Sequence, residues 1–171
     1  EVDGLGLPNV TYTINDSVEN LLSAIDGAQY SGILANASEV NVNQGAERAL
    51  SLDEMKSLVE IVGSFPADIA MNVADDAETI LQFKNSSLGT ERLSVYDADS
   101  IVATNLDGGS PSVNIDGVDE LVSLKHFDLD NSSFNILEDN TVNVLDLIRS
   151  NDPDKSTILA NSNITISEVD P

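Results

Sequence analysis

Hydrophobic residues along this chain switch repeatedly between two spacings, one typical of a strand and one typical of a helix. In residues 11–22, TYTINDSVENLL, Tyr12 and Ile14 alternate with polar residues and predict a strand. Asp16, with Glu19 three residues later, has the spacing of a helix N-cap. The apolar residues that follow recur at helical spacing and predict a short amphipathic helix: Val18, Leu21 and Leu22.

A second unit repeats this order of strand, cap and helix. Val40 and Val42 alternate with asparagines and predict the strand. Ser51 and Glu54 then have the spacing of a capping box, in which each side chain accepts a hydrogen bond from the backbone of the other. The helix that follows has the clearest apolar face in the chain: Leu52, Met55, Leu58, Val59 and Val62.

The order appears a third time in residues 69–81. Ile69, Met71 and Val73 alternate with other residues and predict a strand. Asp75 and Glu78 are the expected cap pair of the next helix. The predicted apolar face of that helix consists of Ala77, Ile80 and Leu81.

Two further units are shorter. Leu93 and Val95 predict a strand, and a helical segment with Asp97, Ile101 and Val102 is expected behind it. Val113 and Ile115 predict another strand. Helices of two turns are marginal on their own, so we expect packing against neighbours to stabilise them. The helical residues of the last unit are Asp116, Val118 and Leu121.

The next strand has two alternatives. Phe127 and Leu129 alternate with polar residues, and so do Phe134 and Ile136. We favour the second pair, because a helical run follows it and none follows the first. That run contains Asp139, Val142 and Leu145, and the chain then ends with a strand at Ile164, Thr165 and Ile166.

The equivalent strand positions are separated by steps of 28, 29, 24, 20, 21 and 30 residues. These steps fall within the range of roughly 20 to 50 residues that solenoid repeats show. Because one strand and one short helix cannot bury their apolar faces alone, we predict an α/β fold, a right-handed β-α solenoid with irregular repeats of about 20–30 residues and a parallel sheet on one side. The positions are Tyr12, Val40, Ile69, Leu93, Val113, Phe134 and Ile164.

This pattern predicts one repeat-built domain over residues 10–171, preceded by a lead-in or linker over residues 1–9. The first eight residues, EVDGLGLP, contain two glycines and a proline, which are typical of a linker. Of the 171 residues, 41% are apolar but only 4% are aromatic, and none is Trp. We therefore expect thin core layers of Val, Ile, Leu and Ala, as stacked repeats have.

The charge of the chain narrows the choice of partners. Thirty acidic residues against seven basic ones give a formal net charge of −23. That field repels phosphate backbones and anionic lipids, so we expect no nucleic-acid partner, whereas divalent cations are attracted. The absence of cysteine excludes disulfides and thiolate metal sites. No apolar run approaches the roughly 20 residues of a membrane span.

Three stretches, TYTINDSVENLL, IAMNVADDAETIL and LSVYDADSIVATNL, resemble the strand-Asp-helix repeats of very large secreted bacterial proteins, including adhesins and haemolysin-type calcium-binding exoproteins. The resemblance implies a spacer or surface-display segment of a secreted protein, with no catalytic residue. The glycine-rich GGxGxD nonapeptide of the calcium roll in those proteins is absent here. A second, local resemblance is to leucine-rich repeats, at Leu121, Leu124, Phe127, Leu129 and Phe134.

Calcium is the one candidate cofactor. Asp128, Asp130 and Ser132 have the first three spacings of an EF-hand loop, and Asp139 falls at its twelfth position. However, the sixth position is Ser133 where that loop needs Gly, and the twelfth is Asp where it needs Glu. Asp128, Asp130 and Asp139 are thus candidate metal ligands, with helix caps and solvated turns as the alternative. A looser calcium site could also draw on Asp97, Asp99 and Asp107.

The sequence gives little support for catalysis. His126 is the only histidine, and its place beside Lys125 in an alternating run indicates a partly exposed strand or turn residue. No Gly-x-Ser-x-Gly motif is present for a serine nucleophile. A glycosidase needs only two carboxylates, but four Phe and three Tyr hardly supply the aromatic platforms of such sites. We predict no enzyme activity and keep a carboxylate-based hydrolase as a third hypothesis.

The leading hypothesis is a non-catalytic structural or adhesive repeat module of a secreted or cell-surface bacterial protein. Its expected partners are neighbouring repeats or copies of itself, and a cell-surface protein or glycan. The alternative is a module that binds calcium, a glycan or a protein through an exposed edge of its sheet or loops.

Overall fold

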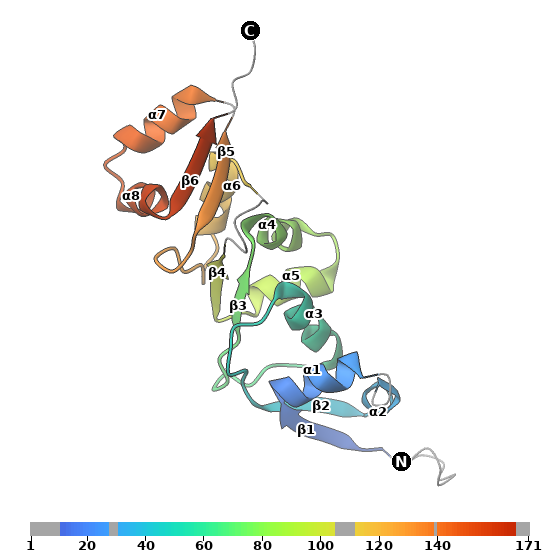
Figure 1. Cartoon of the computed structure of the whole chain (residues 1–171). Helices are drawn as coiled ribbons and strands as arrows, with labels where there is room; N and C mark the ends of the chain where they lie inside the picture. Colours follow the sequence, from blue (N-terminus) through green and yellow to red (C-terminus); the bar gives the residue numbers. More distant parts are fainter. Residues whose placement is uncertain (1–10, 28–30, 105–111, 139, 167–171) are drawn as a thin grey trace.

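The computed structural model describes residues 11–27, 31–104, 112–138 and 140–166 (Figure 1). In this part of the chain the elements follow one another along an elongated molecule, from the first strand at one end to the last strand at the other. The predicted lead-in over residues 1–9 lies outside the described residues, as do Asp107 and Asp139.

Short strands and short helices make up the described residues. The strands are β1 (Thr13–Ser17), β2 (Glu39–Gln44), β3 (Asn72–Asp75), β4 (Ser100–Ala103), β5 (Phe134–Glu138) and β6 (Ser162–Ile166). The helices are α1 (Val18–Asp26), α2 (Ser31–Ala35), α3 (Leu52–Ile61), α4 (Ala77–Asn85), α5 (Gly89–Tyr96), α6 (Ile115–Val122), α7 (Thr141–Arg149) and α8 (Pro153–Ala160). None of these helices combines the length and the hydropathy that a membrane span requires.

The strands pair in parallel. β1 pairs with β2, β3 with β4, and β5 with β6. Each of the two later pairs is extended by a parallel bridge to a single residue that precedes it in the chain, Leu50 to Val73 and Val113 to Ile136. A further parallel bridge joins Ile101 of β4 to Phe127. The chain is thus a mixed α/β protein with small parallel sheets.

The two later pairs repeat each other at a distance of 63 residues. That distance separates Leu50 from Val113, Val73 from Ile136, and Ile101 from Ile164. The order of elements repeats as well, since α3, β3, α4, α5 and β4 are followed by α6, β5, α7, α8 and β6. β1, α1, α2 and β2 have the same order without a leading helix. The sequence predicted single strand-helix steps, whereas the unit that recurs contains several of them.

Five helices begin within three residues of the end of a strand or bridge, and in each a side chain accepts a hydrogen bond from the first turn. These bonds satisfy N–H groups that have no partner inside the helix. The capping box of Ser51 and Glu54 is confirmed with both of its bonds. The five N-caps are Ser17, Ser51, Asp76, Asn114 and Asn140.

Two predicted caps are wrong by one position. Ser17 caps α1 in place of Asp16, and Asp76 caps α4 in place of Asp75. In both places the strand extends further than expected, because β1 includes Asp16 and β3 includes Asp75. Each of these aspartates instead accepts a hydrogen bond from the N–H of the cap residue itself.

The core is a layer of aliphatic side chains, as expected from the composition. Phe83 is the one aromatic residue among the buried side chains that the structure describes. Full burial of a Leu or Ile side chain contributes about 1.5–3 kcal/mol, which is what keeps helices of eight to ten residues folded. The largest side chains that are fully buried are Leu21, Leu50, Leu52, Met55, Leu58, Met71, Ile80, Ile101, Leu121, Ile136 and Leu147.

The fourth predicted unit is wrong in both of its elements. Leu93 and Val95 lie in the helix α5, and Ile101 and Val102 lie in the strand β4. Two apolar residues separated by one position fit a strand and a helix equally well, so packing against the rest of the core determines which one forms. Ile115, predicted as a strand residue, likewise lies in α6.

The choice of Phe134 and Ile136 as a strand is confirmed by β5, which pairs with β6. Phe127, from the alternative pair, lies outside the named strands and forms an isolated bridge to Ile101. The run behind β5 is helical, as predicted, but its inward face differs from the expected one. Val144 and Leu147 are buried, whereas Val142 and Leu145 are exposed.

Candidate functional site

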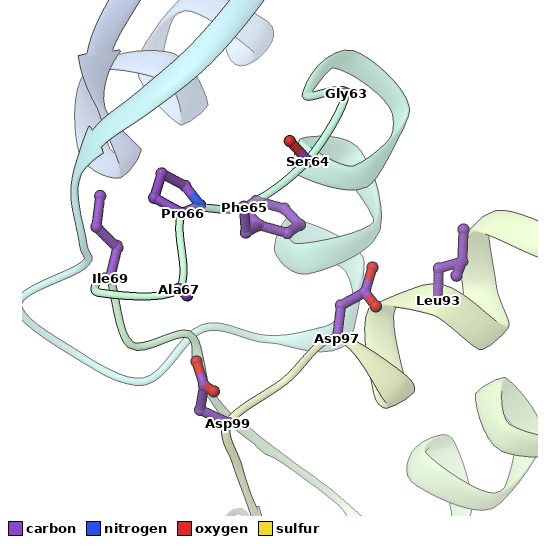
Figure 2. A pocket seen from close by; sticks show the side chains of 9 residues that line it. All are labelled: Gly63, Ser64, Phe65, Pro66, Ala67, Ile69, Leu93, Asp97 and Asp99. Atoms are coloured by element: carbon purple, nitrogen blue, oxygen red, sulfur yellow. The ribbon is translucent and has the colours of Figure 1, made fainter.

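One hollow with ionisable side chains, here named the Asp97 pocket, lies between the segment after α3 and the C-terminal end of α5 (Figure 2). Its volume is about 440 Å³. One wall is made of small and apolar residues, and Asp97 and Asp99 come from the other side. The lining residues are Gly63, Ser64, Phe65, Pro66, Ala67, Ile69, Leu93, Asp97 and Asp99.

Asp99 is hydrogen-bonded to the backbone of Met71. Its carboxylate Oδ2 accepts a hydrogen bond from the N–H of Met71 at 2.9 Å, and its own N–H donates to the Met71 carbonyl at 2.7 Å. Asp99 therefore ties the segment before β4 to the residue before β3.

The other acidic residue of the Asp97 pocket is Asp97 itself. It ends α5, and its N–H donates to the Leu93 carbonyl at 2.8 Å. Partial burial raises the pKa of the Asp97 carboxyl above its ordinary value. Asp97 and Asp99 are both exposed, and Met71 engages one oxygen of the Asp99 carboxylate.

The candidate calcium ligands lie around another hollow, here named the Asp128 pocket. It is formed by the segment after α6 together with α8, and its volume is also about 440 Å³. Asp128 and Asp130 both line it, and Asp154 of α8 lies on its other side. Asp139, the third predicted ligand, lies outside the described residues. The other lining residues are Lys125, His126, Phe127, Leu129 and Thr157.

Hydrogen bonds within the protein explain why Asp128 and Ser132 have this spacing. The Asp128 carboxylate accepts bonds from the N–H and the side-chain amide of Asn131, at 3.2 and 2.8 Å. The buried Ser132 hydroxyl donates to the Asp128 carbonyl and accepts from the N–H of Ala103 at 3.0 Å. This loop therefore closes on β4, and no group of three His, Cys, Asp or Glu side chains among the described residues is placed to hold a metal ion.

His126 contributes its backbone to the fold. Its carbonyl accepts a hydrogen bond from the N–H of Ile101 at 2.9 Å, next to the bridge between Ile101 and Phe127. The residue is partly exposed, as the sequence predicted. His126 and Lys125 both line the Asp128 pocket.

The two pockets occupy equivalent places in the recurring unit. Each lies between the segment that follows the leading helix, α3 or α6, and the helix before the second strand, α5 or α8. Their side chains differ, since the first is lined mostly by small and apolar residues and the second carries charge. A hollow that recurs with different side chains follows from how the elements pack.

One carboxylate contact that sequence reasoning missed links two helices of the same unit. Asp75, at the end of β3, accepts a hydrogen bond from the N–H of Leu52, the first residue of α3, at 2.9 Å, and another from the N–H of Asp76, also at 2.9 Å. One carboxylate thus serves the N-terminal ends of two neighbouring helices. The pairing of Leu50 with Val73 brings these helix ends together, and no local sequence pattern predicts this pairing.

Basic residues also serve contacts between elements. Lys56 of α3 pairs with Glu91 of α5 at 3.1 Å, and Lys84 of α4 pairs with Glu120 of α6 at 3.1 Å. Arg48 pairs with Glu54 at 2.5 Å, beside the capping box of α3. With seven basic residues in the chain, most of the thirty acidic ones have no cationic partner to meet.

Comparison of the chain with protein-family models, with curated proteins and with solved structures finds no match.

Proposed function

We propose that this chain is a non-catalytic structural module whose units stack in series as a β-α solenoid and act as a spacer or assembly unit. The observation that carries the proposal is the recurrence at 63 residues of the same bridges and the same order of elements. What recurs is the framework, while the side chains of the equivalent pockets change. Such a pattern favours a role in building length over a role in binding one small ligand.

The proposed setting is a secreted or cell-surface bacterial protein, in which the chain connects or displays other parts. The resemblance of its strand-Asp-helix stretches to repeats of bacterial adhesins and exoproteins supports this setting. The net charge of −23 supports it as well, because like-charged surfaces repel and keep long molecules from aggregating. The elongated arrangement of the elements suits a spacer (Figure 1).

A deletion in phase with the unit tests the proposal. Removal of residues 50–112 takes out 63 positions and joins Ala49 to Val113, the residue equivalent to Leu50. If the units are modular, the shortened chain folds with a cooperative thermal transition and the helix content expected for its remaining elements. The matched control removes residues 50–92, which joins Ala49 to Leu93 in the middle of α5.

The expected result is that the in-phase deletion folds and the out-of-phase deletion does not, as measured by circular dichroism and by resistance to protease. Small-angle scattering should also show that the in-phase chain is shorter along its long axis. If both deletions unfold, the units are not modular and the proposal fails.

A second candidate is calcium binding, and the observation that favours it is that Asp128, Asp130 and Asp154 line one pocket, although their carboxylates do not form a ready-made metal site. Oxygen-rich clusters of uncompensated charge attract hard cations. Calcium titration after chelation should then raise the melting temperature of the chain saturably, and Asp130→Asn should weaken the effect. Asp119→Asn, at an exposed position of α6, is the control. If the melting temperature does not change with calcium concentration, calcium binding is excluded as the function.

A further inference from the structure

The outer face of α7 is apolar and open. Val142, Leu145 and Ile148, spaced three residues apart along the helix, are 60%, 38% and 56% exposed. The opposite face is buried through Val144 and Leu147. Scattered apolar residues are normal on a protein surface, but three in one stripe of one helix mark a contact face.

The recurring unit identifies the counterpart of this face in α4. The caps of the two helices, Asp76 and Asn140, are 64 residues apart, so each position of α7 corresponds to the position 64 residues earlier in α4. The buried faces agree in this register, since Val144 matches Ile80 and Leu147 matches Phe83. The exposed residues Leu145, Ile148 and Arg149 then match Leu81, Lys84 and Asn85.

In α4 this face is covered by α6, the leading helix of the next unit. Leu81 lies against Gly117, where an added Cβ would be 3.1 Å from the Leu81 Cδ1 atom. The Lys84 Nζ atom lies 3.1 Å from the Glu120 carboxylate and 3.2 Å from the Glu120 carbonyl oxygen. The side-chain amide of Asn85 donates to the same carboxylate at 3.2 Å.

The first unit repeats this contact. α1 packs against α3, the leading helix of the unit that follows it. The caps of α1 and α4, Ser17 and Asp76, are 59 residues apart, so Leu22 of α1 matches Leu81. Leu22 is 9% exposed, against 38% for the matching Leu145 of α7. Two of the three equivalent faces are therefore covered within the chain, each by a helix of the same kind.

We infer that the face of α7 is a docking site for the leading helix of a further unit of the same kind. This inference rests on the proposed function and names the partner that the module takes at this end. The occupant is an amphipathic helix with a Ser or Asn N-cap and apolar residues at its first, fourth and seventh positions. α3 has Leu52, Met55 and Leu58 at these positions, and α6 has Ile115, Val118 and Leu121.

Charge supports the same occupant. Glu120 of α6 meets Lys84 and Asn85 on α4. In α7 the basic residue lies one position later than in α4, because Ile148 corresponds to Lys84 and Arg149 corresponds to Asn85. Arg149 forms no ion pair with the residues that the structure describes. A docked helix with a carboxylate where α6 has Glu120 would meet Arg149 and would bury Ile148.

The test uses the full chain followed by a second copy of its own residues 104–133, which supplies α6 in tethered form. Tethering raises the effective concentration of the helix to the millimolar range, so even a weak contact is populated. The control carries Val118→Asp and Leu121→Asp in the appended copy only. Hydrogen exchange of the amides of α7 is compared among the original chain, the extended chain and the control.

The expected result is that α7 exchanges about tenfold more slowly in the extended chain than in the original chain, and that the control loses this protection. Leu145→Ser in the original copy, an exposed position where folding is not at risk, should cancel it too. Equal exchange in the extended chain and the control overturns the inference. Protection that grows with protein concentration in the unextended chain assigns the face to a second copy and also overturns it.

The failure of this inference can be told apart from the failure of the proposed function. If the chain without residues 50–112 folds but α7 gains no protection, the modular role survives and the docking site does not. If that shortened chain does not fold, the proposed function fails whatever α7 shows.

Discussion

The carboxylate of Asp75 accepts a hydrogen bond at 2.9 Å from the backbone N–H of Leu52, a residue 23 positions earlier in the chain. Leu52 is the first residue of α3, and Asp75 ends β3 and precedes the cap of α4. The parallel bridge from Leu50 to Val73 sets this distance. The start of one helix is thus fixed by the strand that leads into the next, which couples neighbouring steps of the chain.

Replacement of Asp75 by Ala should therefore destabilise the protein through two helices at once. The substitution leaves the N–H groups of Leu52 and Asp76 without their acceptor. We expect the free energy of unfolding to fall by about 1–2 kcal/mol, measured by urea denaturation. Asp75→Asn, which keeps one acceptor oxygen, should give an intermediate loss. Asp119→Ala, at an exposed helix position, is the control, and an equal effect of the two alanine variants would contradict this role.

Gly117 is required by the contact between α4 and α6. A Cβ there would lie 3.1 Å from Leu81 Cδ1, 3.2 Å from Asn114 Oδ1 and 3.3 Å from Val113 Cβ. Ala normally stabilises a helix by about 1 kcal/mol relative to Gly. We expect Gly117→Ala to lower the melting temperature all the same, because Val113 is held by its bridge to Ile136 and cannot move away.

The matched control for Gly117 is Gly89 at the start of α5. An added Cβ at Gly89 meets nothing within 4 Å, so Gly89→Ala should raise the melting temperature. Opposite signs for the two variants would locate the crowding around Gly117, between α4 and the start of α6. If Gly117→Ala also stabilises the chain, the packing at that interface is looser than described.

The sequence predicted the parts of this fold that local chemistry dictates. Ser51 and Glu54 are three residues apart in front of a regular apolar face, and this combination predicts the start of a helix without an alternative. At residues 16–17 and 75–76 two adjacent side chains can each cap a helix, so the length of the strand decides, and that length depends on partners far along the chain. The prediction of a strand at Leu93 and Val95 was wrong for a different reason, because two apolar residues are too few to establish a strand or helix spacing.

The 63-residue recurrence becomes visible in the sequence only when several successive steps between paired positions are compared together. The paired positions Leu50, Val73 and Ile101 are separated by 23 and 28 residues, and so are Val113, Ile136 and Ile164. Counted one strand at a time, these steps look irregular. The sequence marked Asp97 and Asp99 as possible cation ligands but not the pocket that they line, because its other wall comes from residues 63–69, which belong to a different part of the unit.

The raised pKa of Asp97 predicts a specific pH dependence. Its cause is partial burial, which disfavours the charged carboxylate in the folded state. Because the folded-state pKa lies above the unfolded one, the folded protein binds more protons in the interval between them, and stability falls as the pH rises through that interval. Asp97→Asn should remove this fall, so the variant should melt higher than the original chain near neutral pH.

Below the ordinary pKa of Asp both proteins carry a neutral side chain at position 97, so their melting temperatures should converge there. The measurement is a series of thermal melts from acidic to neutral pH. Asp68→Asn, a surface change outside the lining of the Asp97 pocket, serves as control. A constant difference between Asp97→Asn and the original chain across the series would mean that burial of the charge is not the cause.

The pair of Arg48 and Glu54 predicts a pH dependence of the opposite sign. Both oxygens of the Glu54 carboxylate accept from the Arg48 guanidinium, at 2.8 and 2.5 Å, and one also accepts from the N–H of Ser51. The bond from Arg48 is the main reason that the pKa of Glu54 is lowered. Stability from this pair is therefore present above the unfolded pKa of Glu and is lost as the pH falls through the lower, folded value.

Arg48→Gln should accordingly lower the free energy of unfolding at neutral pH by about 0.2–1 kcal/mol, the usual contribution of an exposed ion pair, and should flatten the loss of stability in acid. The gap to the original chain should narrow in 1 M salt, which screens the pair. Arg149→Gln, which removes an equal charge without an ion pair among the described residues, is the matched control. If both variants change the acid limb equally, the effect comes from net charge and the capping box of α3 does not depend on Arg48.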